Sequence, residues 1–255
     1  KQHTLLTFGG AFSNHIAATA AAGFEHNFKT IGVIRGDELA TNFDEVIKIN
    51  PTLKFASEHN MQFHFVSRSE YRNKSNQEFI ANLKEKFGDF YLVPEGGTNN
   101  FAVKGCEEIL SDSDEQYHII CCAIGTGGTI SGLINSSKKH QKIIGFPALK
   151  GDFLQNEIEK YVLRNNNWSL NTRYHFGGYA KISEELITFI NKFKSETQIP
   201  LDPIYTGKMV FGIVDLIKKD YFKKGTKILA IHTGGLQGIE GMNNLLKKKN
   251  LTQIL

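Results

Sequence analysis

Three segments of the chain combine paired glycines with side chains that donate or accept hydrogen bonds, and each follows an apolar run. They are TFGGAFSNH at residues 7–15, AIGTGGTISG at 123–132 and AIHTGG at 230–235. A glycine-rich turn that leads into a helix presents backbone N–H groups and the positive end of the helix dipole, which together suit a phosphate. We therefore expect these turns to form a ligand site at the carboxyl ends of parallel strands, where such sheets bind their ligands.

GTGGT, from Gly125 to Thr129, is the strongest candidate for a phosphate loop, because the hydroxyls of Thr126 and Thr129 can add to the backbone donors. The segment does not match the other nucleotide motifs. No Lys-Ser/Thr pair follows, as a P-loop requires, and Ile130 stands where a dinucleotide-binding fingerprint has glycine. We therefore expect one terminal phosphate and not a diphosphate. The alternative is that these glycines serve only as turn residues after strands.

Polar residues beside the first and third glycine turns are further candidates. Ser13 and Asn14 are predicted to cap the alanine-rich helix that follows them, a role that is compatible with ligand binding. His15 and His232 each lie next to a glycine turn. The spacing of the nine histidines shows no metal-binding motif such as HExxH, so no metal site is expected.

Composition argues against several classes of function. The 255 residues are 40% hydrophobic and 22% charged, and the formal net charge of +4 comes from scattered lysines, so neither disorder nor nucleic-acid binding is expected. No apolar run reaches the ~20 residues that span a bilayer, so no membrane association is expected. Cys106, Cys121 and Cys122 are predicted to be reduced packing groups, which fits a cytoplasmic location.

Strand-like apolar runs alternate with segments of helical periodicity, which predicts an α/β protein with parallel-rich sheets flanked by helices. The strand-like runs lie at 4–8, 29–34, 62–67, 90–95, 117–125, 141–147 and 226–232. The helical segments after the alanine-rich run lie at 45–60, 76–88, 129–140, 182–198 and 209–222. Pro94 and the glycines after it interrupt both periodicities, so we predict a small domain at residues 1–93 and a larger one at 94–255.

Seven motifs, in order, give the chain a resemblance to a known family. They are FGGAFSNH, PEGGTN, GTGGT, GFPALKG, HFGGYAK, LDPIYTGK and HTGG. The set resembles the pyridoxal-phosphate enzymes that include D-cysteine desulfhydrase and 1-aminocyclopropane-1-carboxylate deaminase, in the fold group of the tryptophan synthase β subunit. The resemblance implies two α/β domains with a pyridoxal 5'-phosphate cofactor in the cleft between them, a small amino acid as substrate, and a homodimer.

The resemblance also assigns residues to the cofactor. Those implied to bind it are Asn14, Gly125, Thr126, Gly127, Gly128, Thr129, Thr206 and Thr233. The glycine-threonine loop would hold the phosphate, and Asn14 would form a hydrogen bond with the 3′ oxygen. Thr206 and Thr233 would lie beside the pyridine nitrogen.

Four other residues are implied to face the substrate. Ser13 and His15 would lie where the substrate carboxylate gains from the helix N-terminus, and Ser13 is also a catalytic candidate. Tyr179 and Tyr205 match two active-site tyrosines that would position the substrate or move protons. For both tyrosines, packing beside a glycine turn is the alternative.

One family feature has no counterpart in the sequence. The Schiff-base lysine of the family lies in a GNK-x-R-K segment before the first glycine turn, and no such segment occurs here. Lys104, Lys150, Lys181 and Lys208 lie near other motifs, but none stands at the family position. We therefore expect the sequence to be N-terminally incomplete. The alternative is a relative without the lysine that binds a phosphate ligand and has no catalytic activity.

The expected function is a β-elimination in which D-cysteine gives pyruvate, hydrogen sulfide and ammonia. Alternatives are deamination of 1-aminocyclopropane-1-carboxylate and elimination from D-serine or a related amino acid. In the resemblance, the deaminases tend to carry Glu and Leu at the positions of Thr206 and Thr233, whereas the desulfhydrases carry small hydroxyl residues. A carboxylate beside the ring nitrogen makes a stronger electron sink, which opening a cyclopropane requires, so the two threonines favour D-cysteine.

Overall fold

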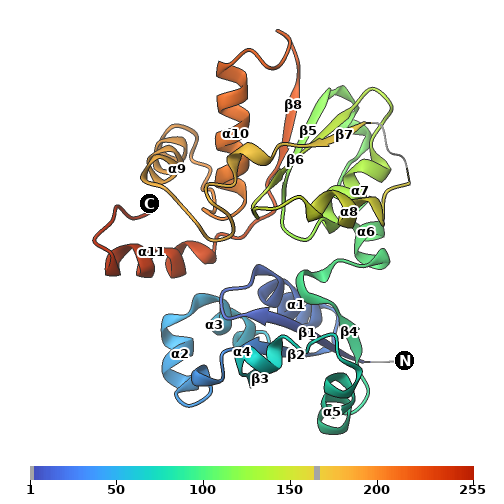
Figure 1. Cartoon of the computed structure of the whole chain (residues 1–255), viewed down its shortest axis with the longest axis vertical. Helices are drawn as coiled ribbons and strands as arrows, with labels where there is room; N and C mark the ends of the chain where they lie inside the picture. Colours follow the sequence, from blue (N-terminus) through green and yellow to red (C-terminus); the bar gives the residue numbers. More distant parts are fainter. Residues whose placement is uncertain (1–2, 164–166) are drawn as a thin grey trace. The chain divides into compact units, whose positions relative to one another are not determined.

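The computed structural model describes residues 3–163 and 167–255, and the chain divides into two compact units, Lys1–Gly97 and Thr98–Leu255 (Figure 1). Each unit contains a four-stranded sheet of its own. All the strand pairs of both sheets are parallel. The predicted α/β class, with parallel sheets flanked by helices, is confirmed.

The first unit is built on a sheet with the strand order β3-β2-β1-β4. Its strands are β1 (Thr4–Gly10), β2 (Lys29–Arg35), β3 (Gln62–Val66) and β4 (Tyr91–Val93). β1 is buried on both faces of the sheet. Leu6 and Thr7 are fully inaccessible to solvent, and Phe8 is nearly so. β2 is buried in the same way over Thr30–Ile34, and buried strands of this kind read as continuous apolar runs, which is how the sequence located these two.

Helices cover both faces of this sheet. They are α1 (Asn14–Glu25), α2 (Phe43–Ile49), α3 (Pro51–Glu58), α4 (Arg68–Tyr71) and α5 (Gln77–Phe87), with short 3-10 turns at Asp37–Leu39 and Glu95–Gly97. Ile16 and Ala20 of α1 pack with Leu53 of α3 in one core cluster. Leu83 of α5 packs with Phe8 in another.

The helix expected at 45–60 is interrupted at Asn50. Asn50 is extended, with φ −115° and ψ 100°, and its side chain accepts a hydrogen bond from the N–H of Leu53. Pro51 is the first residue of the second helix. A proline cannot donate to the preceding turn and disfavours helical geometry in the residue before it, so the periodic pattern belongs to two helices.

The second unit has the strand order β7-β6-β5-β8. Its strands are β5 (Ile119–Ile124), β6 (Lys142–Pro147), β7 (Trp168–Leu170) and β8 (Ile228–Ile231). Cys122 packs into the core cluster on one face of β5 and Cys121 into the cluster on the other, and both are free and fully buried. The prediction that they are packing groups is confirmed, and burial raises the pKa of the Cys122 thiol to about 12.

Helices also flank both faces of the second sheet (Figure 1). They are α6 (Asn100–Cys106), α7 (Gly128–Ser136), α8 (Phe153–Glu159), α9 (Glu184–Thr197), α10 (Thr206–Lys218) and α11 (Gly238–Lys248), with 3-10 turns at Asp112–Gln116 and Thr172–Tyr174. Side chains of α7 and α8 pack on one face of β5, and those of α10 pack on the other. The sequence did not indicate β7, α6, α8 and α11 of this unit, or the short α4 of the first unit.

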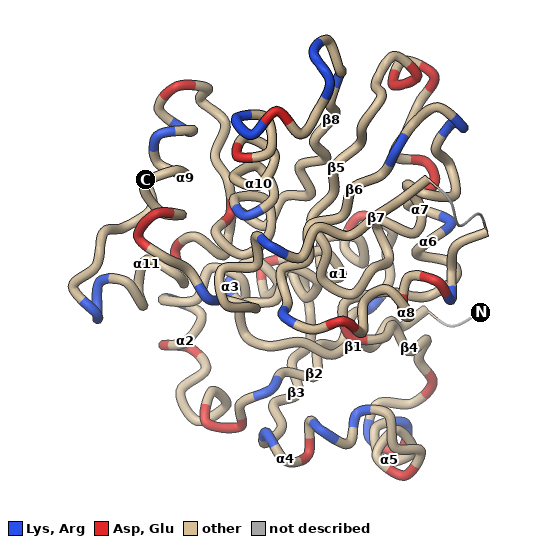
Figure 2. Tube along the Cα trace, turned by 45° about the horizontal axis from the view of Figure 1, so that its top comes forward, with Lys and Arg blue, Asp and Glu red and all other residues tan. Residues whose placement is uncertain are grey.

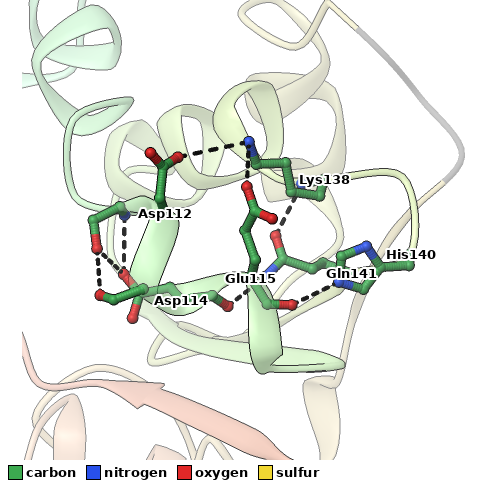
Figure 3. Close-up of polar contacts among 8 residues, drawn as sticks. Asp112, Asp114, Glu115, Lys138, His140 and Gln141 are labelled. Atoms are coloured by element: carbon green, nitrogen blue, oxygen red, sulfur yellow. Dashed lines mark hydrogen bonds and ion pairs between the residues drawn. The ribbon is translucent and has the colours of Figure 1, made fainter.

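A network of polar side chains lies at the end of the second sheet where β5 and β6 begin (Figure 3). The side-chain amide of Gln141 donates to the carbonyl of Asp114 at 2.9 Å and accepts from the N–H of Lys138 at 2.9 Å. Lys138 also pairs with Glu115 at 2.8 Å. The network therefore joins the segment that enters β5 to the segment that enters β6, and it lies at the edge opposite the strand carboxyl ends.

Charged residues of both signs are intermingled along the described trace (Figure 2). Among the residues that the structure describes, no helix is both long and apolar enough to cross a membrane.

Candidate active site

Two of the predicted glycine segments lie at the carboxyl end of the strand at which the order of their sheet reverses, although the first glycine pair forms the last two residues of β1 and not a turn after it. In the first sheet, β1 lies between β2 and β4, and in the second, β5 lies between β6 and β8. Ligands of open α/β sheets bind outside the carboxyl end of such a strand, because the connections to either side leave a crevice there. TFGG closes β1 and GTGGT follows β5, so both segments lie where such sheets bind ligands.

The loop from Gly125 to Thr129 has the backbone of an anion-binding site. Gly127 adopts φ +96° and forms the N-cap of α7, without a side-chain cap and without an acidic residue in the first turn. The first N–H groups of a helix have no acceptor within the helix, and the helix dipole favours a negative charge beside them. This donor set fits a phosphate.

Neither of the paired glycines in this loop has room for a side chain. A Cβ on Gly127 would lie 2.9 Å from Cγ1 of Ile158, and one on Gly128 would lie 2.8 Å from the hydroxyl oxygen of Thr98. That hydroxyl forms a hydrogen bond of 2.6 Å with the hydroxyl of Thr126. Gly127 is therefore required by its backbone conformation as well as by close packing, and Gly128 by close packing alone.

The two threonines of the loop have protein partners. Thr126 is exposed and pairs with Thr98, as above, whereas the hydroxyl of Thr129 forms a hydrogen bond with the thiol of Cys106 in α6. Burial raises the pKa of the Cys106 thiol, against the smaller opposing effect of its hydrogen bond with Thr129. Cys106, the last residue of α6, thus links that helix to Thr129 of the loop. The sequence did not indicate this contact.

Tyr179 and Tyr205 come together beside this loop. Their ring centroids are 6.2 Å apart in an edge-to-face arrangement, and their side chains share a hydrogen bond. The Tyr205 ring packs against Gly125, where an added Cβ would lie 3.3 Å from its hydroxyl oxygen. Burial, followed by the neighbouring Tyr179, raises the pKa of Tyr205 far above its ordinary value, so this hydroxyl keeps its proton at neutral pH.

Thr206 is hydrogen-bonded to Asp202 at the start of α10. Its hydroxyl donates to Oδ2 of Asp202 at 2.6 Å and accepts from the N–H of Asp202 at 2.9 Å. Asp202 also accepts from the N–H groups of Ile204, Tyr205 and Thr206. Thr206 is fully buried, and its one hydroxyl proton goes to Asp202, whose carboxylate accepts the N–H groups at the start of α10.

The third glycine turn emerges at the same edge of the second sheet as the phosphate loop. Ile231 of β8 is paired with Cys122 of β5, and Thr233 follows as an exposed residue. Nδ1 of His232 accepts from the N–H of Gly234 at 3.1 Å, so its Nε2 carries the proton that bonds to the carbonyl of Pro200 at 2.9 Å. His232 thus fixes the turn and leaves Thr233 exposed.

In the first unit, Ser13 and Asn14 begin α1. Ser13 is its N-cap without a side-chain cap bond, and no acidic residue lies in the first turn. Gly9 lets α1 approach β1 closely, since a Cβ there would lie 2.5 Å from Cγ1 of Ile16. This helix N-terminus therefore offers N–H donors and a free serine cap for a carboxylate.

His15 is fixed as a neutral imidazole. The hydroxyl of Thr7 donates to the carbonyl of Val93 at 2.9 Å, so Nε2 of His15 must donate to that hydroxyl, at 2.6 Å. Nδ1 is therefore unprotonated, and it lies beside Gly97, where an added Cβ would be 3.2 Å away. Burial lowers the pKa of His15 to about 4, against the opposing effect of Glu95. In this form His15 accepts hydrogen bonds, so it has no proton to donate to a carboxylate.

Sequence reasoning missed the residues that hold the site residues in place. Thr7 is hidden inside an apolar strand, and no pattern along the chain indicates its contact with His15. Asp202 did carry a signal, because an aspartate followed by proline favours the start of a turn. Lys208 was noted only as a lysine near a motif, yet its side chain is among the largest that are fully buried.

The chain belongs to the pyridoxal-phosphate dependent enzymes, whose family model matches residues 1–234. It is 31% identical over 260 residues to the mitochondrial bifunctional D-cysteine desulfhydrase/1-aminocyclopropane-1-carboxylate deaminase of Arabidopsis thaliana, covering 92% of this chain and 64% of that protein. A putative 1-aminocyclopropane-1-carboxylate deaminase of Pyrococcus furiosus is 30% identical, with 93% of this chain and 76% of the relative covered.

Among solved structures, the chain is similar to an ACC deaminase homologue, with a TM-score of 0.77 and 27% identity. The match covers 97% of this chain and 78% of the other. The resemblance seen in the motifs is thereby confirmed, and pyridoxal 5'-phosphate is the cofactor of the family. The chain spans just under two thirds of the Arabidopsis relative.

Proposed function

We propose that the protein is a pyridoxal-phosphate lyase that converts D-cysteine and water to pyruvate, hydrogen sulfide and ammonia. When bound, the cofactor holds the substrate amine and takes up the electron pair released at Cα. The loop from Gly125 to Thr129 would bind the cofactor phosphate through the N-terminus of α7. The proposed substrate class is supported by the names of the Arabidopsis and Pyrococcus relatives.

We choose D-cysteine as the substrate because of the hydrogen bonds that Asp202, the carboxylate in contact with Thr206, already accepts. Asp202 is buried and already accepts four hydrogen bonds from the first turn of α10, and Thr206 gives its only hydroxyl proton to it. This turn therefore offers no free carboxylate to keep a ring nitrogen protonated. A weaker electron sink is sufficient when a good leaving group such as thiolate is expelled, whereas opening a cyclopropane demands a stronger one.

Other side chains would orient the substrate. Ser13 and the first N–H groups of α1 would bind the substrate carboxylate, while the neutral His15 keeps the start of α1 in place. The Tyr205 hydroxyl keeps its proton, so it would not act as a base at neutral pH. The hydrogen bond between Tyr179 and Tyr205 orients the Tyr205 hydroxyl.

Deamination of 1-aminocyclopropane-1-carboxylate is the second candidate, because several relatives carry that name. The two reactions separate in a direct comparison. Full-length protein loaded with pyridoxal 5'-phosphate is given D-cysteine or the cyclopropane amino acid, and sulfide and 2-oxobutanoate are measured side by side. We expect sulfide release to be much faster. Equal or faster 2-oxobutanoate formation would assign the protein to the deaminases, and turnover of neither would contradict the proposal.

A further inference from the structure

The segment that carries Tyr179 has an unusual backbone. Residues 175–181 connect a short 3-10 turn to the residues that precede α9, and four of them have positive φ: Phe176 at 53°, Gly177 at 91°, Gly178 at 119° and Ala180 at 55°. A residue with a Cβ rarely adopts this conformation, which costs on the order of 1 kcal/mol or more at each such position. Something outside the loop must therefore hold it in this shape.

Lys208 contacts the loop from α10. It is the third residue of that helix and only 2% exposed, and its ammonium donates to the carbonyl of His175 at 3.0 Å and to that of Gly178 at 2.8 Å. These carbonyls lie on either side of Phe176 and Gly177. One cation thus bridges two points of the strained segment.

A lysine is an unfavourable choice at this position for stability alone. The ammonium is buried and lies in the first turn of a helix, where the dipole disfavours a positive charge. Burial lowers the pKa of Lys208 to about 8, against the opposing effect of the Asp202 carboxylate. An apolar side chain would fill the same space without the desolvation of a charge, but it could not donate to two carbonyls.

The contacts of Lys208 lead directly to the two tyrosines. Gly178 precedes Tyr179, whose side chain shares a hydrogen bond with Tyr205, and Tyr205 lies three residues before Lys208 at the start of α10. Tyr205 in turn packs against Gly125 of the phosphate loop. The ammonium therefore ties the loop that carries one tyrosine to the helix that carries the other.

We propose that Lys208 is a positioning residue, whose buried ammonium fixes the 175–181 loop so that Tyr179 meets Tyr205 beside the phosphate loop. The role in turnover rests on the proposed function, whereas the role in ordering the loop does not. Removing the ammonium leaves the two carbonyls without their donor, and the loop relaxes from its left-handed conformation.

Hydrogen–deuterium exchange in the full chain tests the ordering role. In Lys208→Met, the amides of residues 177–181 are expected to exchange at least about tenfold faster, while peptides from β5 and β6 keep the wild-type rate. Lys218→Met, which changes an exposed lysine of the same helix, is the matched control and leaves the loop unchanged. If Lys208→Met does not fold, Lys208→Leu, which also removes the donor to both carbonyls, is measured instead. Wild-type exchange in the loop of the folded variant would overturn the proposal.

A double-mutant cycle tests whether Lys208 acts through Tyr179. Turnover of D-cysteine is measured for Lys208→Met, Tyr179→Phe and the double variant. If Lys208 positions Tyr179, the double variant loses no more than the more impaired single variant. Losses that multiply would show that Lys208 has a structural role of its own and would overturn the positioning role. Absence of turnover in the wild type would contradict the proposed function, and the exchange experiment would still decide the ordering of the loop.

Discussion

At the scale of single residues, the burial of His15 makes the imidazole sensitive to acid. The pKa of His15 lies at about 4 in the folded chain, against 6.5 for an ordinary histidine, because burial disfavours the charged ring. Between these two values the unfolded chain binds more protons than the folded one. Stability contributed by the neutral ring is therefore complete above pH 6.5 and is lost as the pH falls towards 4.

We predict that His15→Gln reduces this acid sensitivity. Wild-type protein should lose about 3 kcal/mol of unfolding free energy through His15 between pH 6.5 and pH 4, a contribution that the variant lacks. Urea unfolding at several pH values measures the difference. His26→Gln, which alters an exposed histidine just after the same helix, serves as the control and should keep the wild-type slope. Parallel slopes for wild type and His15→Gln would contradict the assignment.

The cap of α10 gives a second prediction at this scale. Thr206→Val keeps the volume of the side chain but removes the hydroxyl, so Oδ2 of Asp202 loses a donor and the N–H of Asp202 loses its acceptor. We expect a loss of about 1–3 kcal/mol of unfolding free energy, because both groups are buried. Loss of cofactor binding without loss of stability would instead support a direct contact between Thr206 and the ring.

Single residues also differ in whether a local sequence pattern can predict their contacts. The motifs led to Ser13, Tyr205 and the phosphate loop, because glycine turns and caps are local patterns. The tautomer of His15 depends on Thr7 and on a carbonyl 86 residues further along the chain, at Val93. Such contacts exist only after the sheet has formed, so no local pattern predicts them.

At the scale of elements, the turn between β5 and α7 is the feature whose role is most directly testable. Thr126 is exposed, and no positive φ constrains it, so a substitution there changes the charge and the hydrogen bond with Thr98 without straining the backbone. Gly127 is a poorer choice, because its φ of +96° and its contact with Ile158 would disturb the fold as well.

We predict that Thr126→Asp abolishes retention of pyridoxal 5'-phosphate, because it places a carboxylate against the bound phosphate. Thr126→Asn, of nearly the same size but neutral, should retain most of the cofactor. Occupancy is measured from the visible absorption of the purified proteins, with circular dichroism as the check on folding. Equal occupancy in the two variants would move the phosphate site to another glycine turn.

The elements differ in how well the sequence indicated them. Strands buried on both faces, such as β5, appear as long apolar runs, and all of the expected strands formed. Trp168–Leu170 is an edge strand of three residues, too short to show a periodicity, and it was missed. The segment at 45–60 has helical periodicity throughout, but Pro51 divides it into two helices, so the single predicted helix was wrong.

At the scale of the whole molecule, the second unit contains every part of the proposed phosphate site. Its sheet, its core clusters and the contacts of Gly125–Thr129 with Thr98, Cys106 and Tyr205 all lie within Thr98–Leu255. A unit with its own buried core on both faces of a sheet has what independent folding requires.

We therefore predict that a fragment of residues 98–255 folds alone and binds inorganic phosphate. Phosphate that binds only the folded state raises the midpoint of thermal unfolding with concentration, so the fragment should show such a rise. The same fragment with Thr126→Asp should unfold as cooperatively but without the rise, which separates folding from binding. A fragment without a cooperative transition would show that this unit depends on the rest of the chain. A transition that phosphate does not move would show that the site needs residues outside it.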